Sequence, residues 1–152
     1  MTSTARDETI ELASRLRMAT ARMARFLRQQ DQGELPQGQT SALATIVNRG
    51  PMTLGDVAAR ERIAPPSVTK AVEHLVGRGL VSRRTDPADR RVVLVEATPA
   101  GRELLETNRA RRNEWLVHQL EQLDAAEIVQ LGALLDVLEH LVDVGATEDV
   151  VR

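Results

Sequence analysis

The sequence predicts a mainly helical fold that carries one small β-hairpin. Most of the 152 residues lie in segments whose apolar side chains recur at three- and four-residue steps, the spacing of one face of a helix. Two short β-prone runs, residues 80–84 and 91–96, flank a turn and predict the hairpin. Phe26 and Trp115 are the only aromatic residues. Aliphatic side chains, alanine and methionine must therefore build the core.

A capped helix is expected to begin at Thr53. Thr53 and Asp56 have the spacing of a capping box, and Met52 and Val57 stand at the two ends of a hydrophobic staple. The helix should break near residues 63–64, because the two prolines that follow cannot lie inside a helix.

A second helix is expected to begin at one of these prolines and to stop at Gly79, with Leu80 folding back on it. Helical spacing places Val68, Val72 and Leu75 on one side, which should face the core. The other side and its flanks are small and polar, and they suit contact with base edges and phosphates: Pro66, Ser67, Thr69, Lys70, His74. Taken alone, these residues also fit an ordinary solvated helix face.

The predicted hairpin has an arginine-rich tip and base. Its turn, residues 86–89, has the Asp-Pro order typical of a β-turn. Arg90 and Arg91 at the tip suit a narrow, strongly negative minor groove. Arg83 and Arg84 suit phosphate contacts or internal ion pairs. The alternative is a solvated loop in which two or more of these arginines pair with Asp86 and Asp89.

Helix, turn, helix and hairpin in this order form a winged helix-turn-helix, a unit that places one helix in the DNA major groove. The run also resembles the MarR family of bacterial transcription regulators, whose wing reads Asp-x-Arg, three residues, an aliphatic, any residue, Leu and Thr. This chain has Asp89-Arg90-Arg91, then three residues and Val95-Glu96-Ala97-Thr98, with similar flanks at residues 79–81 and 98–101. Ala97 replaces the usual leucine, and Ala64 stands where the family often has a serine-like cap. Arg91 matches the family's wing arginine best.

The resemblance implies a two-fold dimer built by the outer helices. It also implies a small, often aromatic, anionic effector between the dimer helices and the winged domain. Helix face and charge suggest four residues for the wall of that site: Arg15, Met18, Arg22, Arg112. The predicted organisation is a dimerisation helix in residues 1–34, a DNA-binding domain in 35–98 and dimerisation helices in 99–152.

The boundaries of the helices before Thr53 and after Thr98 follow from local signals. Residues 1–8 are expected to be frayed, and a helix from residue 8 to 30 should end at residues 31–33. A short helix begins around Pro36 and stops at residues 48–51. A long helix follows the Thr98 cap to about Leu123, and a last helix follows the Asp124 cap to Gly145. The first helix and the last two helices have more apolar surface than a small winged domain can cover, which favours a partner surface.

Charge and composition limit the classes of function that this protein can have. The net charge is −2, but residues 1–112 hold 19 lysines and arginines against 13 acids, and residues 113–152 hold one arginine against nine acids. An acidic end on a mildly basic body is expected if one part meets DNA. With no cysteine and three scattered histidines, neither a metal nor another cofactor is expected. No phosphate loop or nucleophile–base pair is evident, so an enzyme is improbable.

The prediction is therefore a dimeric, ligand-responsive repressor that binds a palindromic operator in double-stranded DNA. Apolar runs are too short to span a membrane and the N-terminus is polar, so we expect a soluble, cytoplasmic protein. The competing interpretations are a winged-helix protein-interaction module without a DNA role and, with no residue to support it, a small enzyme.

Overall fold

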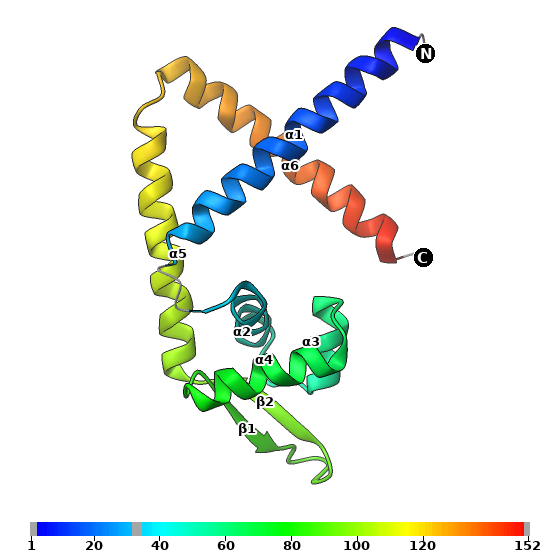
Figure 1. The fold of residues 1–152 in the computed structure, drawn as a ribbon, viewed down its shortest axis with the longest axis vertical. Coiled ribbons are helices and arrows are strands. Elements are labelled where there is room, and N and C mark those ends of the chain that lie inside the picture. Colours follow the sequence, from blue (N-terminus) through cyan, green and yellow to red (C-terminus); the bar gives the residue numbers. More distant parts are fainter. Residues whose placement is uncertain (1–2, 32–34, 151–152) are drawn as a thin grey trace. The chain divides into compact units, whose positions relative to one another are not determined.

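The computed structural model describes residues 3–31 and 35–150, with side chains for 5–31 and 35–143 (Figure 1). It confirms a mainly helical fold with one two-stranded antiparallel hairpin. The elements in chain order are α1 (Ser3–Gln29), α2 (Gln37–Arg49), α3 (Leu54–Glu61), α4 (Pro65–Gly77), β1 (Val81–Thr85), β2 (Val93–Ala97), α5 (Pro99–Leu120) and α6 (Ala125–Val150).

Two compact units divide the chain, residues 1–112 and 113–152. The first unit holds α1 to α4, the hairpin and the first part of α5. The second holds the end of α5 and α6. The division into dimerisation and DNA-binding parts predicted from the sequence concerns function and stays a prediction.

The core of the first unit lies among α2, α3, α4 and the hairpin, which pack on one another (Figure 1). Leu43 and Ile46 of α2, Val57 of α3 and Val72 and Leu75 of α4 are fully buried. Burying one such side chain stabilises the fold by about 1.5–3 kcal/mol relative to leaving it exposed. The aliphatic spacing therefore positions α4 through its inner face, as the sequence predicted.

The capping box at the start of α3 is confirmed. The Asp56 amide donates to the Thr53 hydroxyl at 3.1 Å, and the Thr53 amide donates to the Asp56 carboxylate at 3.1 Å. These hydrogen bonds lower the pKa of Asp56, with the Thr53 hydroxyl as the main cause. The helix ends at Glu61, two residues before the predicted break. Because Pro65 keeps the preceding residue extended, the turn takes place earlier, at Arg62, whose φ is 52°.

The α4 helix begins at Pro65 without a side-chain cap, as predicted. At its end, the Leu80 amide donates to the Leu75 carbonyl and the Gly79 amide to the Val76 carbonyl, both at 2.9 Å. Gly79 has a φ of 70°, the left-handed conformation that this closing motif needs and that glycine adopts without steric cost.

The hairpin pairs Val81 with Ala97 through to Thr85 with Val93, so both strands lie about one residue later than predicted. Met52 adds a bridge to the other edge of β2, where its amide and carbonyl exchange hydrogen bonds with Val95 at 3.2 and 2.8 Å. The segment before α3 is thereby fixed to the base of the wing.

Besides the end of α3, three further predicted helix limits are wrong. The first helix begins at Ser3 rather than near residue 8, and α5 ends at Leu120 rather than Leu123. Gly145 does not end α6, which continues to Val150, because a glycine terminates a helix only where the chain turns left-handed. The predicted capping box of Asp124 and Glu127 is confirmed, with amide-to-carboxylate hydrogen bonds of 2.8 and 2.9 Å. The stop predicted at residues 31–33 lies mostly outside the described residues.

Candidate nucleic-acid interface

The outer face of α4 is polar and open to solvent. Pro66, Ser67, Lys70 and His74 are exposed, while Thr69 is half-buried and donates its hydroxyl to the Pro65 carbonyl at 3.0 Å. Within the described residues, the side chains of Ser67 and Lys70 have no hydrogen bond or ion pair. The Ser67 hydroxyl and the Lys70 ammonium are therefore available to a ligand, whereas the Thr69 hydroxyl is engaged within the helix.

The wing arginines fall into two groups. Arg84 pairs across the hairpin with Glu96 at 2.9 Å, and Arg91 pairs with Asp89 through contacts of 3.2 and 3.3 Å. Arg83 and Arg90 have no ion pair with any described residue. The possibility of internal pairing is thus realised for Arg84 and Arg91, although the Arg91 side chain remains 92% exposed.

The loop between the strands holds Arg90 and Arg91 at its end. The Asp86 amide donates to the Val92 carbonyl at 2.9 Å, which closes a loop longer than the predicted four-residue turn. The Asp89 carboxylate also accepts the Arg91 amide at 3.0 Å. The Arg91 side chain and then this amide lower the pKa of Asp89, so Asp89 stays ionised at neutral pH and orients its neighbour.

The helix and the wing share a groove of about 500 Å³. Thr69 and Glu73 of α4, Arg83 of the wing and the capped start of α3 all line it. Of the predicted contact residues, Thr69 and Arg83 are those that the structure brings together in this groove. An exposed polar helix beside an arginine-bearing hairpin, braced by a capped helix, defines a winged helix-turn-helix protein of the DNA-binding type.

Comparisons with known proteins agree with this class. The model of the MarR family matches residues 35–93. An uncharacterized HTH-type transcriptional regulator of Mycobacterium leprae is 40% identical over 138 residues, which cover 90% of this chain and 96% of the relative. The crystal structure of a putative transcriptional regulator from Pseudomonas aeruginosa is 32% identical, covers 89% of this chain and 96% of its own, and has a TM-score of 0.81.

The chain therefore belongs to the MarR family, a family of transcriptional regulators rather than enzymes. MepR F27L of S. aureus, solved bound to an oligodeoxyribonucleotide, shares the fold at 23% identity, with a TM-score of 0.69 over 86% of this chain and 97% of its own.

A separate pocket of about 410 Å³ lies within the first unit, a volume typical of small-molecule sites. Of the four residues predicted for an effector site, Arg112 lines it, whereas Arg15, Met18 and Arg22 do not and are exposed. The lining residues are Ala24, Leu27, Arg28, Asp31, Leu35, Gln37, Thr40, Ser41, Ala44 and Arg112.

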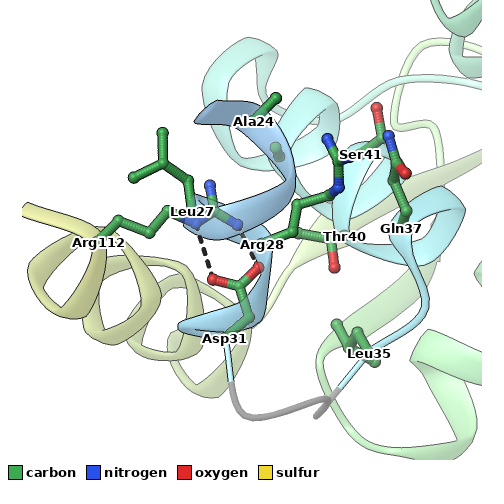
Figure 2. A pocket seen from close by; sticks show the side chains of 10 residues that line it. Ala24, Leu27, Arg28, Asp31, Leu35, Gln37, Thr40, Ser41 and Arg112 are labelled. Carbon is green, nitrogen blue, oxygen red and sulfur yellow. Dashed lines mark hydrogen bonds and ion pairs between the residues drawn. The ribbon is translucent and has the colours of Figure 1, made fainter. Parts of the chain in front are cut away.

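The pocket is bordered by an ion pair between Asp31 and Arg112 (Figure 2). The Arg112 Nε donates to Asp31 Oδ1 at 2.7 Å, and a second guanidinium nitrogen donates to the other oxygen. This bidentate contact raises the pKa of Arg112. In the view of Figure 2, Arg28 lies between this pair and the hydroxyls of Thr40 and Ser41. No local pattern indicated that Asp31 would be buried, yet it is only 8% exposed in spite of its charge.

Among the residues that the structure describes, no group of three or more His, Cys, Asp or Glu side chains is placed to hold a metal ion. None of the described helices combines the length and the apolar character needed to cross a membrane.

Proposed function

We propose that this protein is a dimeric repressor that binds a palindromic operator and releases it in response to a small anionic ligand. The observation that carries the proposal is the polar outer face of α4 beside the arginines of the wing. Both present donors to solvent, and residues of both line one groove.

In this proposal the DNA contacts divide by groove. The exposed side of α4 enters the major groove and reads base edges there. The wing tip enters the adjacent minor groove, where a narrow, negative channel favours arginine. The contact residues are Pro66, Ser67, Thr69, Lys70 and His74 in the major groove, Arg90 and Arg91 in the minor groove, and Arg83 and Arg84 on phosphates.

The dimer is supported by apolar side chains that the chain leaves in solvent. Exposed apolar surface on a helix commonly marks a partner interface. A single winged domain also contacts few base pairs, whereas a two-fold dimer reads two half-sites about 34 Å apart. The large apolar residues exposed on α1 and α6 are Ile10, Leu12, Met18, Met23 and Phe26, and Ile128, Val129, Leu134, Leu135, Val137, Leu141 and Val142.

The ligand response is supported by the pocket of the first unit. Its apolar wall includes Leu27 and Leu35, and its cations are Arg28 and Arg112. Asp31 neutralises Arg112, whereas Arg28 has no ion pair with any described residue, so the lining suits an organic anion with an apolar body. Binding shifts the protein toward release only if the ligand prefers the state that does not hold DNA.

Repression requires only that the operator is occupied, because a dimer bound over a promoter excludes other proteins from the same duplex. A regulator of this kind acts where the DNA is, so we propose a cytoplasmic location. The test is selection of bound duplexes from a random pool. Recovery of a palindrome with half-sites about one helical turn apart supports both DNA reading and dimer symmetry. Failure to enrich any sequence would favour the protein-interaction module instead.

A further inference from the structure

Ser41 touches both the pocket and the helix-turn-helix. It is half-buried on α2, lines the pocket beside Thr40, and donates its hydroxyl to Oε2 of Glu61. Glu61 is the last residue of α3. One hydrogen bond therefore joins the wall of the pocket to the first helix of the DNA-reading pair.

Glu61 depends on its two donors from α2. Thr45, one helical turn beyond Ser41, donates to the other carboxylate oxygen of Glu61. A carboxylate at the C-terminal end of a helix faces the negative end of the helix dipole, so it needs donors to remain there. The hydroxyls of Ser41 and Thr45 provide them and fix the end of α3 to α2.

The end of α3 also sets the start of α4. Arg62, which follows Glu61, has a left-handed backbone, and only residues 62–64 separate Glu61 from Pro65. Three residues span at most about 10 Å. A change in how Glu61 is held therefore acts directly on the turn that orients the outer face of α4.

A serine hydroxyl has one proton and donates one hydrogen bond at a time. Arg112 is paired with Asp31, and the Thr40 hydroxyl donates to the Pro36 carbonyl at 3.3 Å. Arg28 lines the pocket without an ion pair to any described residue, so an occupant with acceptor oxygens suits this site. An occupant that accepts the Ser41 proton takes it away from Glu61.

We propose that Ser41 is the positioning residue through which this pocket acts on DNA binding. A small organic acid bound as its carboxylate competes with Glu61 for the Ser41 hydroxyl, releases the end of α3, and changes the orientation of α4. The inference rests on the proposed function, since it needs both DNA binding and a ligand-responsive pocket.

The experiment uses the full chain, a labelled duplex from the random-pool selection, and millimolar benzoate as the probe. DNA affinity is measured by fluorescence anisotropy with and without benzoate, and benzoate binding by calorimetry. We expect benzoate to weaken DNA binding by the wild type about tenfold, within the usual range of such couplings. Ser41→Ala should still bind benzoate but show less than a twofold change in DNA affinity.

Thr45→Ala is the matched control, because Thr45 donates to the same carboxylate but does not line this pocket. Both alanine variants should bind DNA more weakly without benzoate, by similar factors, since each removes one donor from Glu61. Only Thr45→Ala should lose further affinity when benzoate is added. Ser41→Thr retains a hydroxyl and should restore the response, and thermal melting shows whether each variant is folded.

An equal benzoate response in Ser41→Ala and wild type would overturn the role of Ser41 and leave the proposed function intact. If the wild type binds the duplex but neither binds nor responds to benzoate, the inference and the proposed ligand class are both overturned, but DNA binding is not. Failure of the wild type to bind any selected duplex would overturn the proposed function itself.

Discussion

Replacement of Arg91 by alanine tests the wing. Its side chain is 92% exposed, and among the described residues its guanidinium pairs only with the Asp89 carboxylate. The variant loses a cation at the tip and leaves the Asp89 charge unneutralised there, so its DNA affinity should fall at every sequence. The fold should be retained, because an ion pair this exposed contributes little to stability.

The salt dependence gives the magnitude. Each cation that neutralises a phosphate contributes about 0.9 to the slope of log affinity against log salt, so two wings of the proposed dimer contribute about 1.8. Between ~50 and ~200 mM salt, the ratio of wild-type to variant affinity should therefore shrink by about 12-fold. Anisotropy titrations at four salt concentrations measure both slopes.

Two matched variants complete the test. Arg91→Lys keeps the charge, so the slope should be retained while affinity falls, because lysine lacks the planar fork of the guanidinium. Arg25→Ala removes the same charge from the exposed surface of α1 and should leave the slope unchanged. An Arg91→Ala slope equal to that of the wild type, or equal losses in Arg25→Ala, would refute the assignment of Arg91 to DNA.

Further predictions concern the scaffold, and urea denaturation of each variant measures them. Gly101→Ala should lower the free energy of unfolding by about 3 kcal/mol, because its Cβ would lie 2.2 Å from the Leu80 carbonyl oxygen; an unchanged midpoint would contradict this packing. Asp31→Ala should lower the free energy of unfolding by about 2 kcal/mol, because it leaves the charge of Arg112 without a partner. This value lies between those for exposed and buried ion pairs. A more stable variant would show that the pair does not stabilise the fold. Thr53→Ala should be less stable at neutral pH. The capping-box carboxylate has a lowered pKa in the folded protein, so its contribution is present above the unfolded pKa and is lost as the pH falls through the folded one. As the pH falls, the free energy of unfolding of the variant should therefore decrease less than that of the wild type. A pH dependence of stability parallel to that of the wild type would argue against a stabilising cap.

Local rules predicted the winged domain well. Thr53 and Asp56 form their capping box, Gly79 closes α4, and the inner valines of α4 are buried. Each of these depends on residues within five positions of one another, so the sequence contains the cause. The end of α3 was misplaced because a non-glycine residue, Arg62, adopts the left-handed turn, which no propensity favours.

The residues that line the pocket could not be predicted from such local rules. Helix face and charge singled out Arg15 and Arg22, which do not line this pocket, and did not indicate Arg28 and Asp31, which do. Asp31 lies 81 residues from its partner Arg112, so nothing in its neighbourhood indicates burial. The same holds for Ser41, whose bond to Glu61 joins two helices. Contacts made by tertiary packing leave no periodic signal in the chain.

Methylation protection of a selected duplex by dimethyl sulfate tests the central claim most directly, since it reads both grooves at once. Guanine N7 reports on the major groove and adenine N3 on the minor groove. Wild type should protect both kinds of site, Lys70→Ala should lose protection at guanine N7 alone, and Arg91→Ala at adenine N3 alone. Loss of the same sites in both variants, or protection unchanged in both, would contradict a helix and a wing that hold one duplex together.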